Sequence, residues 1–305
     1  MNQLIKDYLE NISNILFFKK AYFGLAFLAI FVGFSPHLAI SGIFASLVGY
    51  TFSVKNSTPK LLRDAGLLTL NGFFLGIAMA SLFPDSPQFY FFLLIGALSV
   101  PLVTLATHEI LQHWKLSPFI ISYIIVVWVL FLSARAISMD LLLYPALDSS
   151  PFVDQLFNSP YLAVRFAAAV LTSMGYLFFL PNPIFGLCIL ALVSFFGPRQ
   201  GFYFLLGTSV ATFAAFLLSS QQLTIIDFDK YTYSAGLIGI GLAAWPEKFS
   251  YRTITLFCTI SVIVTLALVH LLSKFDLPAL SLPYVLTIWL ALLSRTPRYN
   301  IKWAD

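Results

Sequence analysis

The sequence predicts an all-α protein that crosses a membrane many times, and three observations carry this prediction. Hydrophobic residues make up 59% of the 305 residues and charged residues only 10%, whereas soluble domains carry about 25% charged residues. Long apolar runs recur along the chain, and the order found in its first half returns in its second half. The basic residues behind the net charge of +4 lie in short loops, which is typical of membrane topology signals rather than of nucleic-acid binding.

The apolar runs predict helices of unequal length. Residues 2–18 are predicted to form a short amphipathic helix. The apolar runs that follow are 21–34, 37–54, 72–83, 90–112, 117–137, 162–180, 183–196, 200–219, 234–245, 252–273 and 279–296. Several of these are shorter than the roughly 20 residues that a helix needs to cross a bilayer. We therefore expect short, tilted or half-length helices, particularly at 72–83 and 234–245.

Four segments recur in the same order at nearly one spacing, which predicts an internal duplication. The matched pairs are NILFFKKAYFG (14–24) with YLFFLPNPIFG (176–186), SP (35–36) with GP (197–198), NGFFLGIAMA (71–80) with SAGLIGIGLA (234–243), and EILQHWKLSP (109–118) with HLLSKFDLPA (270–279). A polar, proline-containing stretch separates the copies and is typical of a linker. The predicted division is a first repeat at 1–137, a linker at 138–160, a second repeat at 161–296 and a cytoplasmic tail at 297–305.

Each repeat is predicted to hold five transmembrane helices plus a half-length pore helix. Because five is an odd number, the second repeat would enter the membrane inverted, as in many transport proteins. With this topology, thirteen Lys and Arg residues fall on one side of the membrane and four on the other. Since basic residues gather in cytoplasmic loops, both termini of a multi-pass protein in the cell (inner) membrane are expected to be cytoplasmic.

The stretch DLPALSLPY (276–284) is the strongest local signal in the chain. Pro278 and Pro283 disturb helical hydrogen bonding at the start of the last apolar run, and Ser281 lies between them. In lipid, irregular backbone is tolerated only where protein buries it or where it lines a polar cavity. The stretch therefore indicates one wall of a pore at a broken helix, and a plain loop followed by a Pro-initiated helix is the alternative.

These segments resemble the urea transporter family across both repeats. DLPALSLPY is similar to that family's LP-x-x-T-x-PF signature, with Ser281 for the threonine and Tyr284 for the phenylalanine. YSAGLIG (233–239) is similar to its aromatic-Asn-x-x-L-x-G segment, which LNGFFLG (70–76) repeats in the first half. NPIFG (182–186) is similar to the Asn-Pro-x-x-Gly turn that follows a pore helix in the family.

The resemblance implies a passive channel for urea or a closely related small neutral amide. By position it implies that the pore is lined by Phe17, Leu70, Phe74, Phe179, Tyr233 and Leu237. A slot of aromatic faces about one ring thick admits a flat neutral solute but denies a hydrated ion its water shell.

Polar positions of the family are changed in this chain. Asn14 and Tyr176 stand where the family has a longer carboxamide or a carboxylate, and each would exchange hydrogen bonds with the solute. Ser281 would add one more hydrogen bond, whereas Ile120 occupies the matching place in the first repeat. The resemblance further implies a homotrimer in the lipid bilayer with one pore per protomer, no enzymatic activity, no cofactor, no metal and no nucleic-acid partner.

Two other functions remain open from the residues alone. Glu109 and His270 occupy matching places and could relay protons in a coupled secondary transporter. The changed polar positions are also compatible with a non-conducting scaffold or receptor that keeps the fold. The chain carries no Gly-rich phosphate loop, nucleophile elbow or Cys/His metal cluster, and Cys188 and Cys258 both lie within apolar runs.

Overall fold

The computed structural model describes residues 2–56, 58–143, 151–218, 225–245 and 247–294, and within these ranges it contains helices and no strand. The helices are α1 (Gln3–Ser13), the 3-10 turn η1 (Asn14–Leu16), α2 (Ala21–Phe34), α3 (Pro36–Lys55), α4 (Lys60–Asp64), α5 (Leu67–Leu82), α6 (Pro87–Leu111), the 3-10 turn η2 (Gln112–Trp114), α7 (Ile121–Ala136), α8 (Pro151–Phe157), α9 (Leu162–Tyr176), α10 (Pro183–Phe196), α11 (Pro198–Leu218), α12 (Ile225–Ala243), α13 (Tyr251–Ser273) and α14 (Leu282–Leu293). The predicted all-α class is confirmed.

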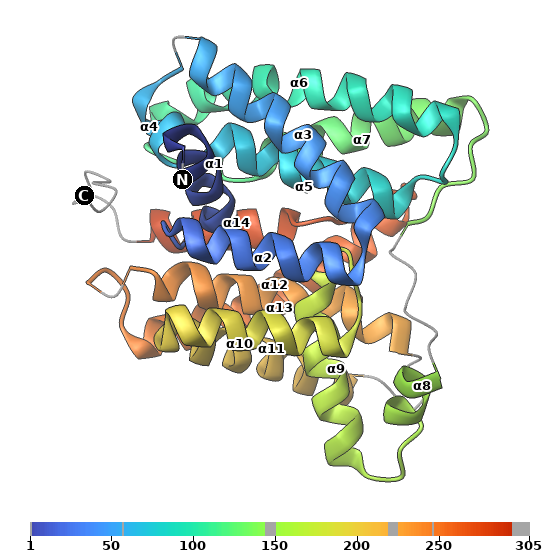
Figure 1. Cartoon of the computed structure of the whole chain (residues 1–305). Helices are drawn as coiled ribbons and strands as arrows, with labels where there is room; N and C mark the ends of the chain where they lie inside the picture. Colours follow the sequence, from blue (N-terminus) through green and yellow to red (C-terminus); the bar gives the residue numbers. More distant parts are fainter. Residues whose placement is uncertain (1, 57, 144–150, 219–224, 246, 295–305) are drawn as a thin grey trace.

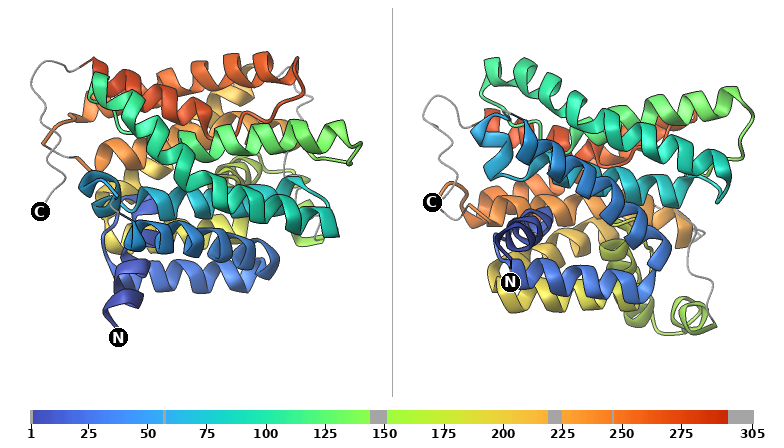
Figure 2. Two further views of the ribbon diagram at one scale, coloured as in Figure 1. Left: turned by 90° about the horizontal axis from the view of Figure 1, so that it is seen from above. Right: turned by 45° about the horizontal axis from the view of Figure 1, so that its top comes forward.

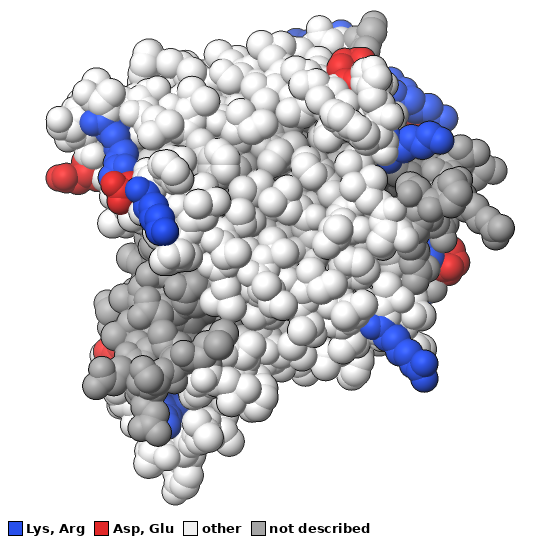
Figure 3. All heavy atoms as spheres, turned by 180° about the vertical axis from the view of Figure 1, so that it is seen from behind, with Lys and Arg blue, Asp and Glu red and all other residues white. Residues whose placement is uncertain are grey.

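The helices form a polytopic membrane protein. Four of them are long and apolar enough to cross a bilayer unaided, namely α3, α6 with η2, α11 and α13. A fifth candidate is the bent pair formed by Gln3–Leu16 and Ala21–Phe34, whose axes differ by 73°. On the face in Figure 3, charged side chains gather at two opposite ends of the molecule, and the band between them is uncharged. This distribution is the one expected of a surface in contact with lipid.

The molecule has two groups of helices that meet along its middle. Helices α3, α5, α6 and α7 lie above α9, α10, α11, α12 and α13 in Figure 1, with α2 and α14 between the groups. The groups touch where α2 packs against α10 and where α14 packs against α7 and α12. The views in Figure 2 also place α2 alongside α10. Helix α1 and the end of α14 lie at the same end of the molecule.

Backbone geometry repeats at the spacing of the matched sequence segments. Helices α2 and α10 have the same length, and their starts have the same spacing as the starts of α3 and α11. Three pairs of non-glycine residues adopt the left-handed conformation at that spacing to within one position: Phe17 with Phe179, Lys115 with Asp276, and Phe119 with Leu280. Such residues are uncommon, so the same rare backbone turn occurs at matching places in both halves.

Most helix bounds lie close to those expected, and two differ. Helix α5 begins five residues before the run at 72–83, and α12 begins nine residues before the run at 234–245. Asn71 is the polar residue that interrupts the pattern in α5, but its side chain is buried and fully hydrogen-bonded, so it does not end the helix. The 16 residues of α5 span about 24 Å, less than the roughly 30 Å of a hydrocarbon core.

The stretch expected to be a linker contains structure of its own. Residues 151–157 form α8, and the Leu142 amide donates to the Leu82 carbonyl at 2.9 Å, which ties the chain after α7 to the end of α5. Residues 144–150 of that stretch and the tail predicted at 297–305 lie outside the described residues.

Close contact between each half-length helix and the helix after it depends on a glycine. A Cβ atom at Gly24 would overlap the carbonyl of Leu9, and one at Gly186 would overlap the carbonyl of Leu171. These two contacts occupy matching places in α1–α2 and α9–α10. Small residues allow this close approach of helix backbones, which is the usual way that membrane helices associate.

We expect Gly186→Ala to destabilise the protein, because the new methyl group forces α10 away from α9. The expected loss is about 1–3 kcal/mol, the usual cost of overpacking. Thermal unfolding in detergent measures it, and Gly33→Ala is the matched control because nothing lies within 4 Å of a Cβ there. Equal melting temperatures for the two variants would contradict the packing described here.

Candidate functional site

Two cavities lie where the halves meet, and together they are lined by all nine residues predicted for the pore. The larger has a volume of about 180 Å³ and is lined by five of them: Asn14, Phe17, Leu70, Phe74 and Leu237. The smaller has a volume of about 20 Å³ and is lined by the other four: Tyr176, Phe179, Tyr233 and Ser281. A volume of roughly 10–15 Å³ on this scale holds one water, so the larger cavity has room for a small solute and the smaller for about one water.

The larger cavity runs from charged, accessible residues to fully buried ones. Its lining includes the exposed Lys19 and the half-buried Asp64. It also includes Phe74, Leu237 and Tyr284, each 2% exposed. Because a lysine within the hydrocarbon is costly, the exposed Lys19 indicates that this end of the cavity lies near the membrane interface or in a wet vestibule.

Asn14 supplies an amide to the larger cavity at the point where α1 ends. The nitrogen of its side chain donates to the Ala65 carbonyl at 3.4 Å, a long hydrogen bond. The backbone then turns through the left-handed Phe17, whose amide donates to the Asn14 carbonyl at 3.0 Å. The Ser13 hydroxyl bonds the Phe18 carbonyl and accepts from the Lys20 amide, so the turn is held by side chain as well as backbone.

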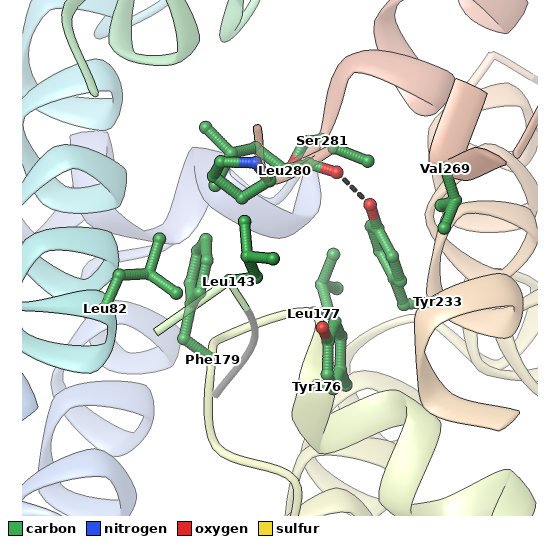
Figure 4. Close-up of a pocket in the computed structure, with 11 residues that line it drawn as sticks. Leu82, Leu143, Tyr176, Leu177, Phe179, Tyr233, Val269, Leu280 and Ser281 are labelled. Atoms are coloured by element: carbon green, nitrogen blue, oxygen red, sulfur yellow. Dashed lines mark hydrogen bonds between the residues drawn. The ribbon is translucent and has the colours of Figure 1, made fainter. Parts of the chain in front are cut away.

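The smaller cavity is lined by aromatic and aliphatic side chains from the second half together with Leu82 and Leu143 (Figure 4). The rings of Tyr176 and Tyr233 lie 5.3 Å apart. Tyr233 points toward the broken stretch before α14, and its hydroxyl donates to the Leu280 carbonyl. Tyr233 therefore lines the smaller cavity, while its hydroxyl is hydrogen-bonded to the backbone of the broken stretch.

The two cavities share no lining residue, and an aromatic layer formed by Phe74 and Tyr123 connects their linings. Phe74 faces the larger cavity and stacks on Tyr123, with ring centroids 5.4 Å apart and planes 21° apart. The Tyr123 hydroxyl donates to the Ser281 hydroxyl at 2.7 Å, and Ser281 lines the smaller cavity. A continuous pore between the two cavities therefore stays a prediction.

Each broken stretch is held by a tryptophan from the opposite half. The indole nitrogen of Trp128 donates to the Pro278 carbonyl at 2.8 Å, and that of Trp289 donates to the Ser117 carbonyl at 2.9 Å. The two tryptophans occupy matching places in the repeats, and so do their two acceptors. In the last turn of α7, Arg135 adds an ion pair with Asp276 at 3.3 Å.

The carbonyl of the left-handed residue in each stretch is also satisfied, but by different side chains. In the first half, the Asn71 side chain donates to the Phe119 carbonyl at 2.8 Å and accepts from the Tyr123 amide at 3.0 Å. Ser234 stands at the matching place in the second half and is too short for this role, and its buried hydroxyl has no partner in the described structure. Tyr233 supplies the bond to Leu280 instead.

Several residues of this site were not predicted from the sequence. They are Asn71, Tyr123, Trp128, Tyr284 and Trp289. The long-range hydrogen bonds that four of them form join residues that are 48 to 172 positions apart in the sequence. Local patterns do not show such contacts. The repeat spacing could have found them, because it aligns Tyr123 with Tyr284 and Trp128 with Trp289.

The groups considered for a proton relay lie elsewhere. Glu109 and His270 are both exposed, and neither lines either cavity. The Glu109 carboxylate accepts from the Gln112 side chain one turn later, and the His113 ring lies 2.9 Å from the Glu109 carbonyl. This arrangement fits a solvated end of α6.

Comparisons with known proteins agree with the resemblance seen in the motifs. The model of the family described as "UT: Urea transporter" matches residues 5–296. The chain is 32% identical over 171 residues to Urea transporter 1 of Rattus norvegicus, which covers 54% of this chain and 44% of that protein. It is also 32% identical over 158 residues to Urea transporter 1 of Capra hircus, covering 50% of this chain and 40% of that protein. The matched stretch therefore spans less than half the length of each relative.

We expect Trp128→Phe and Trp289→Phe each to destabilise the protein, because each leaves a buried carbonyl without its donor. Such a loss costs about 1–3 kcal/mol. Thermal unfolding in detergent measures it, with Trp114→Phe as the control because that side chain is 59% exposed. If both variants have the same melting temperature as the control, the two indole hydrogen bonds do not stabilise the broken stretches.

Proposed function

This chain belongs to the urea transporter family, and from that premise we propose that it is a passive transmembrane channel for urea or a closely related small neutral amide. The observation that carries the proposal is the placement of the nine residues. All nine line two cavities whose linings are connected through the rings of Phe74 and Tyr123. The family is one of transport proteins rather than of enzymes, which fits the interpretation of the two cavities as parts of a solute pathway rather than as an active site.

The path would run through the larger cavity, past Phe74 and Tyr123, and into the smaller cavity. Opening it requires the Tyr123–Ser281 hydrogen bond to exchange and the side chains of the layer to move. Rotamer changes of this kind are fast compared with backbone rearrangements. Since both helices that carry Phe74 and Leu237 are buried, the proposed gate consists of side chains on a rigid frame.

Polar atoms on both sides of the layer would replace the water that the solute loses. Asn14 offers an amide on one side, and Tyr176 and Ser281 offer hydroxyl groups on the other. Each lost solute–water bond is costly if it is not replaced, yet tight binding would stop conduction. The single long bond from Asn14 to Ala65 leaves that amide able to exchange partners.

The linings oppose ions more strongly than neutral solutes. Charged side chains line the larger cavity only at Lys19 and Asp64, and the described lining of the smaller cavity holds none. A hydrated ion would have to shed water against ring faces and aliphatic groups, at a cost that these residues do not repay. The second candidate, a proton-coupled transporter, draws no support from Glu109 and His270, since both lie away from the cavities.

We further propose that the two halves, 1–137 and 161–296, are inverted copies of one unit and that both termini are cytoplasmic. The recurring left-handed turns and the matched tryptophan bonds support the duplication. Helix α1 and the end of α14 lie at one end of the molecule, which supports placing both termini on the same side of the membrane. A homotrimer with one pore per protomer, placed in the cell membrane, is proposed on the family alone.

The proposed function is tested by stopped-flow shrink–swell of proteoliposomes with urea, formamide, acetamide or glycerol gradients. Urea flux well above that of protein-free liposomes, without any ion or pH gradient, is the expected result. Flux that appears only with a pH gradient would favour the coupled transporter. No flux of any of the four solutes would contradict a channel and favour the scaffold.

Within the same assay we expect Phe74→Ala to relax size selection, because it removes the ring that faces the larger cavity. The ratio of acetamide flux to urea flux should rise about tenfold, since fit in an apolar slot is worth on the order of 1–3 kcal/mol. Phe91→Ala is the control, because that ring is 62% exposed on α6. A ratio unchanged from the wild type would remove Phe74 from the path.

A further inference from the structure

The two halves exchange hydrogen bonds in matched pairs, and one bond of the set is missing. Trp128 donates to Pro278, and Trp289 donates to Ser117 at the matching place. Tyr123 donates to Ser281 at 2.7 Å and also accepts from the Ser281 amide at 3.2 Å. The matching pair is Tyr284 with Ile120, since the repeat spacing that relates the tryptophans also relates these residues to Tyr123 and Ser281. The side chain of Ile120 has no polar atom, so this bond is not formed.

The hydroxyl of Tyr284 consequently lacks the partner that its counterpart Tyr123 has. Tyr284 is 2% exposed and lines that cavity together with Ile120. No residue in the described part of the chain forms a hydrogen bond with its hydroxyl, and its one recorded ring contact is with Phe119 at 6.4 Å. The unpaired hydroxyls of Ser234 and Ser261 are fully buried and neither residue lines the larger cavity, whereas Tyr284 does.

A buried hydroxyl without a partner is unfavourable, and nearly all such groups in proteins are satisfied by protein or by ordered water. Since no described residue bonds the Tyr284 hydroxyl, its partner is a molecule in the cavity, either water or the solute that displaces it. The same lining supplies the amide of Asn14 and the flat faces of Phe17 and Phe74. A tyrosine hydroxyl can donate one hydrogen bond and accept another, which suits a molecule with a carbonyl oxygen and N–H groups.

We propose that the Tyr284 hydroxyl is a direct, specificity-determining contact for a small neutral amide held in the larger cavity. This inference rests on the proposed function and deepens it. It makes the path chemically unequal on its two sides, because the Ser281 hydroxyl is already bonded to Tyr123 while the Tyr284 hydroxyl is open to the solute. Ile120, which stands where the other half has Ser281, cannot bond the Tyr284 hydroxyl.

The first test compares Tyr284→Phe with Tyr22→Phe in the proteoliposome assay. Tyr22 is 76% exposed on α2 and serves as the matched control. The expected result is a roughly three- to tenfold rise in the urea concentration that half-saturates flux, or an equal fall in flux where flux is linear, the usual effect of losing one hydrogen bond. Wild-type flux in Tyr284→Phe would overturn the inference and leave the channel proposal intact.

A structural role for the hydroxyl is separated by melting temperature in detergent without added solute. Tyr123→Phe loses two recorded hydrogen bonds and should melt lower than the wild type. Tyr284→Phe should melt at or above the wild-type temperature, because it removes an unpaired polar group from a buried site. A fall in Tyr284→Phe equal to that in Tyr123→Phe would overturn the inference, since it would mean that the hydroxyl is bonded within the protein.

The last test is independent of conduction. Saturation-transfer difference NMR with N-methylurea reports weak binding to the solubilised protein through the methyl protons of the probe. The expected result is a signal with wild type and Tyr22→Phe that falls severalfold in Tyr284→Phe. A signal equal in all three, or absent from all three, would overturn the inference. Binding without flux would contradict the channel proposal alone, so the two failures can be told apart.

Discussion

Unpaired backbone carbonyls in the middle of a membrane protein are the constraint on which this structure depends. The chain leaves helical geometry before α7 and before α14, and lipid offers no donor to the carbonyls exposed there. Two indole nitrogens, one asparagine and one tyrosine hydroxyl supply the donors. Because the tryptophans come from the opposite half, satisfying the backbone also fixes the two halves together and places the cavities between them.

The two halves keep the same backbone turn with different side chains at matching places. Asn71 holds the Phe119 carbonyl in one copy. In the other copy Ser234 is too short to do so, and the neighbouring Tyr233 reaches the Leu280 carbonyl. The same acceptor is served by a different side chain, so the turn survives. At position 120 the side chain is apolar, and no neighbouring described residue supplies a hydrogen-bond partner for the Tyr284 hydroxyl in its place. That hydroxyl is the one we propose to contact the solute.

Periodic and repeated features of this chain could be predicted from the sequence, and long-range pairs could not. The bounds of α2 and α10 agree with the apolar runs 21–34 and 183–196, because prolines and polar residues mark their ends. The starts of α5 and α12 were missed because polar residues interrupt the apolar pattern there, namely Asn71 in α5 and Asp227, Asp229 and Lys230 in α12. The nine lining residues came from resemblance. The aromatic layer, with Tyr123 bonded across 158 residues to Ser281, depends on a fold that no local pattern records.

The reciprocal tryptophan bonds also govern the order in which the protein can mature. Ser117 is made long before Trp289, and the two meet only after the last helix has entered the bilayer. Until then the first half carries a backbone acceptor whose indole donor has not been synthesised. A ribosome-bound first half is thus an incomplete structure rather than a finished domain. The Ser117 carbonyl therefore gains its indole donor only once α14, which carries Trp289, is in place.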